Sequence, residues 1–147
     1  MKDRLVHFTK ILLDAAFYIG IPVTAAVPYL VIAVAHIPFM TSVYWGVTLI
    51  MMTSGVFALL IFSELRKIFR TVVAGDCFRR ENVTSLSRMG WYSFAISLVY
   101  VIRMFIYPTP SALVIIIVFV IAGLFSKVLS RVFDQAVTYK IENDLTI

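Results

Sequence analysis

The sequence carries few charged residues for its length. Charged residues account for 14% of the 147 residues, whereas hydrophobic residues account for 61%. A soluble domain has about 25% charged residues, so this composition excludes an ordinary soluble globular fold. The single cysteine, Cys77, excludes an internal disulfide bond. The composition instead indicates a chain whose apolar side chains are covered by lipid.

Sequence motifs that carry catalysis are also lacking. The chain contains no H-E-x-x-H, no G-x-S-x-G, no phosphate-binding G-K-[ST] loop and no C-x-x-C. No nucleophilic residue is accompanied by a recognisable base. We therefore expect a protein that is not an enzyme and that has no catalytic residues, cofactor or metal site.

Four long apolar stretches are present, at about residues 11–35, 43–62, 89–107 and 110–129. A helix needs about 20 apolar residues to cross a bilayer, so each stretch can cross once. The sequence therefore predicts an all-α integral membrane protein, a single domain of residues 1–147 with four transmembrane helices. The largest segments outside the spans are a middle loop, 63–88, and a tail, 130–147. Pro22 and Pro28 should bend the first span, because proline removes a backbone donor and crowds the preceding turn.

Basic residues are confined to one side of this topology. Of the 13 Lys and Arg residues, 12 lie near the N-terminus, in the middle loop, or from Lys127 onward. The connections at about 36–42 and 108–111 contain none. Basic loops remain in the cytoplasm, so both termini and the middle loop are predicted to be cytoplasmic. The net charge of +5 should favour contact with anionic lipid in the bilayer rather than nucleic acid.

The middle loop and the tail show helical patterns of their own. In residues 64–73 the apolar residues fall on one face of a helix and the charged residues on the other. This pattern predicts an amphipathic helix that either continues the second span or lies in the membrane interface. Gly75 is placed to end this helix, and Asn82 to cap the next one. Beyond the fourth span the helical pattern continues past Arg131.

Two charged residues lie within the predicted spans, where charges are often functional. For Asp14, the simpler interpretation is an interfacial carboxylate paired with Lys10 or with an arginine of the middle loop. For Arg103, the simpler interpretation is that its side chain extends to the outer headgroups beside Tyr100 and Tyr107. A role in contacting a ligand remains the alternative for both charges.

Small residues recur at four-residue spacing in the first span, at Ala16, Gly20 and Thr24. Such a stripe allows another helix to approach closely. We expect it to pack inside the bundle, with the seam of a homo-oligomer as the alternative.

Five segments in the middle loop, at the start of the third span and in the tail carry a resemblance to a known family. They are Gly75–Phe78, Asn82, Leu86–Gly90, Val132–Ala136 and Glu142–Ile147. These segments resemble a bacterial membrane family, domain of unknown function 2975. Two residues depart from the family pattern: Cys77 stands where proline is usual, and Ala136 where glycine is usual. The resemblance implies four spans in the bacterial cytoplasmic membrane. It assigns no activity, but such proteins are often encoded beside small helix-turn-helix DNA-binding regulators.

The organised, motif-bearing residues are nearly all on the predicted cytoplasmic side. We therefore expect this face to dock a soluble partner, which the resemblance suggests is a small helix-turn-helix regulator. Leu145 and Ile147 are expected to bury against residues 65–73. The alternative is a small transporter, channel or immunity-type protein that handles a hydrophobic or peptide molecule near Arg103. The candidate docking residues are Phe78, Asn82, Arg88, Glu142, Asp144, Leu145 and Ile147.

Overall fold

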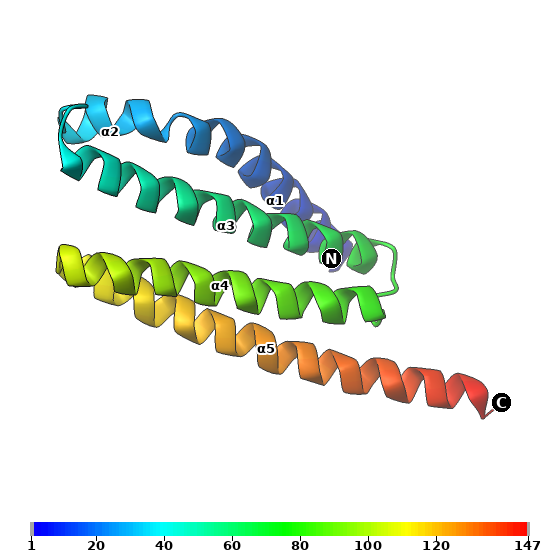
Figure 1. Cartoon of the computed structure of the whole chain (residues 1–147). Helices are drawn as coiled ribbons and strands as arrows, with labels where there is room; N and C mark the ends of the chain where they lie inside the picture. Colours follow the sequence, from blue (N-terminus) through cyan, green and yellow to red (C-terminus); the bar gives the residue numbers. More distant parts are fainter. Residues whose placement is uncertain (1, 147) are drawn as a thin grey trace.

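The computed structural model describes residues 2–146, and within this range it contains helices but no strand. Four of the helices are long and apolar enough to cross a membrane, in agreement with the predicted class. The helices are α1 Lys2–Ala25, α2 Val27–Ala35, α3 Ser42–Val73, α4 Arg80–Ile106 and α5 Pro110–Leu145 (Figure 1). The chain is therefore an all-helical protein of the membrane type.

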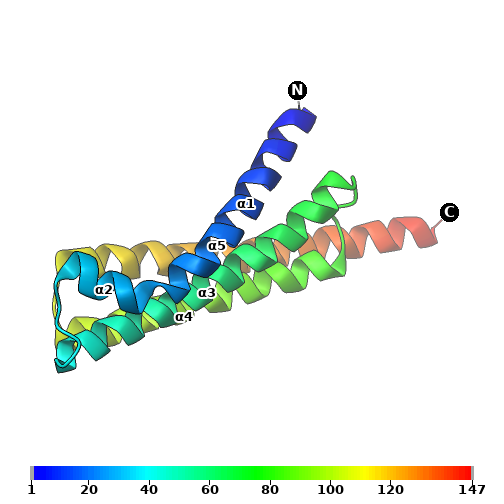
Figure 2. The same cartoon turned by 90° about the horizontal axis from the view of Figure 1, so that it is seen from above.

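The predicted bend in the first span lies at Ala26, between α1 and α2. Pro22 is inside α1 and Pro28 is in the first turn of α2, so the two prolines flank the break. Backbone hydrogen bonds from Ala26 to Pro22 and from Leu30 to Ala26 still cross it. Figure 2 shows the consequence: α2 lies along the bundle, whereas the first turns of α1 diverge from it.

The helices pack in the order of the sequence. Helices α1 and α2 contact α3, α3 contacts α4, and α4 contacts α5 (Figures 1 and 2). Helix α4 is central, because it has neighbours on both sides and contains more buried residues than any other helix described. The outward faces of α1 and α5 are apolar and exposed, as expected for surfaces that lipid would cover.

Close approach between helices depends on small residues. A Cβ atom added to Gly20 would lie 2.8 Å from Leu59, and one added to Gly55 would lie 2.8 Å from Thr24. Gly20 and Thr24 of the predicted stripe thus face α3, which confirms a packing face inside the bundle. Helices α4 and α5 approach closely at Gly123, where a Cβ atom would lie 2.7 Å from the ring of Phe94.

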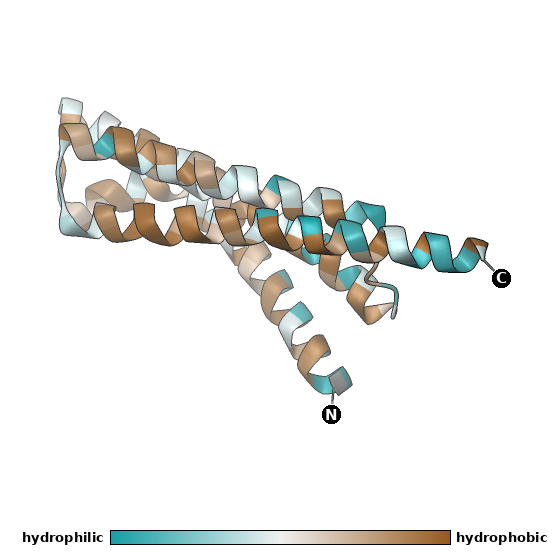
Figure 3. Ribbon diagram, turned by 90° about the horizontal axis from the view of Figure 1, so that it is seen from below, coloured by the Kyte–Doolittle hydropathy of each residue, from teal (hydrophilic) through white to brown (hydrophobic). Residues whose placement is uncertain are grey.

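The two ends of the bundle differ in character. At one end lie the first turns of α1, the connection 74–79 and the C-terminal part of α5, and we call this the basic end (Figure 1). Hydrophilic residues gather there, whereas the middle of the bundle is hydrophobic (Figure 3). At the opposite end, the hydroxyl of Tyr44 donates to the carbonyl of Pro28 at 3.2 Å and ties α2 to α3. That the basic end faces the cytoplasm stays a prediction.

Helices α3 and α5 both continue well beyond the predicted spans. The amphipathic segment 64–73 is part of α3. It therefore continues the second span, which is one of the two arrangements that the sequence predicts. Helix α5 continues past Arg131 to Leu145, as the pattern predicts. At about 1.5 Å per residue, residues 130–145 extend about 24 Å beyond the predicted fourth span.

Candidate functional site

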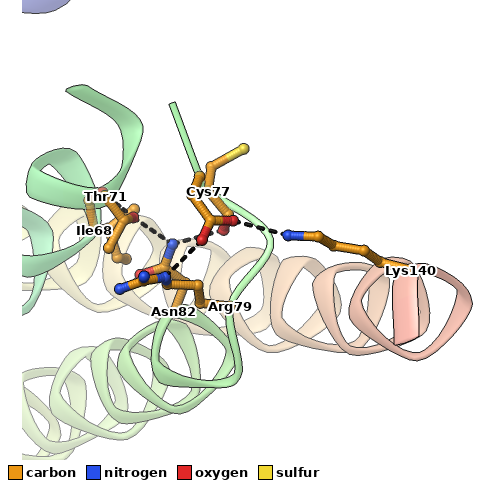
Figure 4. Close-up of polar contacts among 7 residues, drawn as sticks. Ile68, Thr71, Cys77, Arg79, Asn82 and Lys140 are labelled. Atoms are coloured by element: carbon orange, nitrogen blue, oxygen red, sulfur yellow. Dashed lines mark hydrogen bonds and ion pairs between the residues drawn. The ribbon is translucent and has the colours of Figure 1, made fainter. Parts of the chain in front are cut away.

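The connection between α3 and α4 is a short, well-tied segment at the basic end. Gly75 has a φ of 78°, in the left-handed region that glycine adopts without a steric penalty, and it ends α3 as predicted. The expectation that Asn82 caps α4 is wrong, because α4 begins at Arg80 and Asn82 lies inside its first turn. Asn82 is only 1% exposed. Its amide donates to Thr71 Oγ1 and to the carbonyl of Cys77, each at 2.6 Å (Figure 4).

Asn82 therefore holds the end of α3, the connection and the start of α4 together. A buried amide needs hydrogen-bond partners. Its partners here, the hydroxyl of Thr71 and the carbonyl of Cys77, come together only when the connection is folded. Because its side chain is occupied and covered, Asn82 offers a partner no accessible surface, which removes it from the candidate docking residues.

A charged network joins the connection to α5. Asp76 accepts a hydrogen bond of 2.8 Å from Arg79 and one of 3.0 Å from Lys140 (Figure 4). The hydrogen bond from Arg79, followed by that from Lys140, lowers the pKa of Asp76 below its ordinary value. Asp76 in turn raises the pKa of Arg79. Lys140 thus fixes α5 to the connection near the point where α5 leaves the bundle.

The same face of the connection packs on α5 through apolar and charged contacts. The rings of Phe78 and Phe133 are 5.6 Å apart between centroids. Arg80 forms an ion pair with Asp134. Next to these contacts lies a shallow groove of about 450 Å³, which we call the connection–α5 groove. It is lined by residues 78–81 and by Val137, Lys140, Ile141 and Asp144.

The last turns of α5 project from the bundle. Leu145 is 81% exposed, so the expectation that it buries against residues 65–73 is wrong. The reason is geometric: α5 runs on as a continuous helix to Leu145 and does not fold back toward α3. Glu142 is also exposed, and Asp144 lines the connection–α5 groove. Ile147 lies outside the described residues.

A second groove, of about 560 Å³, lies between the ends of α3 and α4, and we call it the α3–α4 groove. Arg88 lies in its wall, 3.8 Å from Glu64. Glu64 is 4% exposed and accepts a hydrogen bond of 3.0 Å from Lys67 through the same oxygen, Oε1. Its other oxygen, Oε2, is buried without a hydrogen-bond partner. Sequence reasoning missed Glu64, which the amphipathic pattern placed on the polar face of its helix.

The two predicted intramembrane charges lie far apart. Asp14 pairs with Arg66 of α3, with Nε 2.5 Å from Oδ1, which confirms the interpretation as a paired carboxylate. Arg103 lies at the opposite end, where its guanidinium is 5.8 Å from the ring centroid of Tyr100 and donates to Thr109 at 3.2 Å. It borders a small, mainly apolar pocket of about 270 Å³.

Comparison with known proteins identifies a family and no more specific relative. Neither the curated proteins nor the solved structures contain a match to this chain. A family described as Protein of unknown function (DUF2975) matches residues 18–147, which include α2 to α5 and both grooves at the basic end. Because this match covers most of the chain, the protein belongs to the DUF2975 family, as its loop and terminal motifs predict.

Proposed function

We propose that the protein docks a soluble partner at its basic end, on the connection–α5 groove and the projecting turns of α5. The observation that carries this proposal is an apolar stripe on α5. Phe133, Val137, Ile141 and Leu145 recur every four residues and therefore share one face of the helix. The stripe begins packed, with Val137 3% exposed, and ends uncovered, with Ile141 45% and Leu145 81% exposed.

Exposed apolar side chains are ordinary on the spans, where lipid would cover them, but not about 24 Å beyond the predicted fourth span. A helix that presents residues at i and i+4 is a common element of recognition by a partner helix or groove. Arg80, Lys140 and Asp144 all line the groove and give its rim charges of both signs. A partner with an apolar helix face and a mixed polar rim would fit.

A small helix-turn-helix regulator is the partner that the family resemblance suggests. In this proposal the membrane protein captures or releases the regulator in response to a signal. Such control requires two states of the bundle that differ in affinity for the regulator. The bend at Ala26 and the diverging first turns of α1 are where the described structure could change without disturbing α4 and α5.

A binding experiment tests this proposal. The detergent-solubilised protein, tagged at the N-terminus, is used to retain the purified helix-turn-helix regulator that the family resemblance predicts to be encoded beside its gene. We expect Leu145→Asp and Ile141→Asp to reduce retention at least about tenfold, since each places a charge in an apolar contact. Both side chains are exposed, so the thermal stability of these variants should match that of the wild type. Leu5→Asp is the matched control, because Leu5 is an apolar residue of α1 that is 68% exposed. Equal retention by all variants would reject docking on this stripe.

A second candidate function is supported by the pocket beside Arg103. Its lining from α3 and α4 is mainly apolar, and Arg103 supplies one positive charge near Tyr107. A small transporter, channel or immunity-type protein could use such a pocket to hold an amphiphilic molecule or peptide. Arg103→Ala should abolish any export or resistance phenotype under this function, while truncation after residue 141 should leave it intact. An unchanged phenotype in Arg103→Ala would exclude it.

A further inference from the structure

The α3–α4 groove is lined by positive charge. Four cationic side chains contribute to its wall, and Glu81 is the only acidic residue in the lining among the described residues. The other polar residues of the lining, Thr71, Asn82 and Ser85, are neutral. The cations are Lys67, Arg70, Arg79 and Arg88.

The positive charge is only partly neutralised by neighbouring carboxylates. Lys67 and Arg88 share a single oxygen of Glu64, at 3.0 and 3.8 Å. Arg79 is paired with Asp76, and Arg70 has no carboxylate within ion-pair distance in the described part of the chain. The side chains of Lys67, Arg79 and Arg88 remain 52–56% exposed despite their partners. All of these cations can therefore reach a ligand in the groove.

The start of α4 adds to this potential. No side chain caps the helix, because the guanidinium of the N-cap residue Arg79 has no acceptor for the first-turn N–H groups. The helix dipole places partial positive charge at the same point. Glu81 and Asn82 of this first turn line the groove, so the helix terminus opens into it.

The predicted spans place the groove at the depth of lipid headgroups. The predicted second span ends at Phe62 and the third begins at Met89, so Arg88 is about 2 Å and Lys67 about 8 Å beyond the hydrocarbon. The headgroup layer occupies roughly 5–8 Å on each side of the core. The mouth of the groove thus overlaps the layer of lipid phosphates, and Arg70 and Arg79 lie farther toward the aqueous side.

We propose that the α3–α4 groove is a binding site for a phosphate-bearing anion, either the headgroup of an anionic phospholipid or a free phosphate. Arginine guanidinium groups form paired hydrogen bonds with phosphate oxygens, and Lys67 adds a point charge. Arg70 is the principal anchor, because it has no carboxylate to release before it binds. Binding would link the ends of α3 and α4 across the connection. The two grooves share Arg79 and Glu81, but Arg70 lines only the α3–α4 groove, so its role in anion binding does not depend on the proposed partner.

The test measures binding of three probes to the full chain in a neutral detergent. The probes are dihexanoyl phosphatidylglycerol, dihexanoyl phosphatidylcholine and inorganic phosphate. Their binding is measured by calorimetry and native mass spectrometry. We expect phosphatidylglycerol to bind more tightly than phosphatidylcholine and to bind less tightly as salt is raised. Arg70→Gln should weaken binding by at least about tenfold, as loss of a charge-assisted hydrogen bond does. Arg70→Lys should weaken binding less than Arg70→Gln, because it keeps the charge but loses the paired hydrogen bonds.

Arg131→Gln is the matched control, since it removes an exposed arginine from α5 that does not line the groove. Binding of phosphatidylglycerol alone, weakened by Arg70→Gln but not by Arg131→Gln, would identify the lipid headgroup as the ligand. Binding of inorganic phosphate with the same dependence on Arg70 would identify a soluble anion. Equal weakening by both glutamine variants, or no preference for either anion over phosphatidylcholine, would overturn the proposal.

Discussion

Asp14 of α1 and Arg66 of α3 form a hydrogen-bonded ion pair of 2.5 Å between residues 52 positions apart. The guanidinium also lies over the rings of Phe17 and Tyr18, 4.6 and 4.9 Å from their centroids. The two charges are partly covered, with 34% and 23% of their side chains exposed. The first turns of α1 diverge from the bundle (Figure 2). The ion pair therefore attaches the polar part of α1 to α3.

A double-mutant cycle should measure this attachment. We expect Asp14→Ala and Arg66→Ala to be coupled by about 1–2 kcal/mol, because each leaves the other charge without its partner. Each variant should lower the melting temperature in detergent by about 2–6 °C. Lys10 is the control, since the sequence offered it as the other partner of Asp14 and it forms no ion pair in the described structure. Coupling of Asp14 to Lys10 as strong as to Arg66 would contradict this pairing.

Asn82 should be essential to the stability of the basic end. Asn82→Ala removes the two donors that satisfy Thr71 and the carbonyl of Cys77, at a cost of about 2–3 kcal/mol. Thermal unfolding of the purified protein would measure this loss. Asn143→Ala is the matched control, because Asn143 is exposed near the end of α5 and its side chain has no hydrogen bond in the described structure. Equal melting temperatures for the two variants would show that Asn82 is not a structural tie.

The sequence predicts features of this protein that depend on local pattern. Apolar length predicts the spans, Pro22 and Pro28 predict the bend, and the positive φ of Gly75 follows from its place after the amphipathic segment. Asn82 resembles a helix cap in sequence, because a polar residue before a helix commonly acts as one. Its real partner, Thr71, lies on another helix, and only the folded connection brings the two residues together.

Long-range partners in the candidate site could not be predicted for the same reason. Lys140 and Asp76 are 64 positions apart, and no pattern in either segment specifies the other. In the tail, by contrast, the sequence suggested a long-range contact that the structure does not have. Leu145 is apolar, which suggested that it packs on this chain, but apolar character does not say which surface covers a residue. The continuous helix carries it away from α3 instead.

The contact between α4 and α5 should depend on the absence of a side chain at Gly123. Gly123→Ala would place a Cβ atom 2.7 Å from the ring of Phe94, and we expect a loss of about 1–3 kcal/mol from the resulting overpacking. Gly46→Ala is the control, because nothing lies within 4 Å of its added Cβ atom. That variant should be neutral or more stable by up to about 1 kcal/mol, since alanine favours a helix over glycine. A melting temperature of Gly123→Ala that equals or exceeds that of Gly46→Ala would show that the close approach to Phe94 does not limit the packing of α4 on α5.

Thiol labelling tests the orientation on which the docking proposal depends. Met40, which is 93% exposed, and Ser111, which is also exposed, lie at the end opposite the basic end. Both are better positions for introduced cysteines than Thr41, whose side chain caps α3 by accepting from the backbone of Tyr44. In a Cys77→Ser background, each of these cysteines should react with an impermeant thiol reagent on intact cells, because basic loops remain inside.

Asn143→Cys in the same background reports on the basic end. This exposed position should stay unlabelled on intact cells and become labelled once the membrane is opened, at a rate similar to that of Met40→Cys. It is a better reporter than native Cys77, which is partly covered and would react slowly on either side of a membrane. Labelling of Asn143→Cys but not Met40→Cys on intact cells would place the basic end outside. The exposed apolar stripe of α5 would then face the exterior, where a cytoplasmic regulator could not reach it.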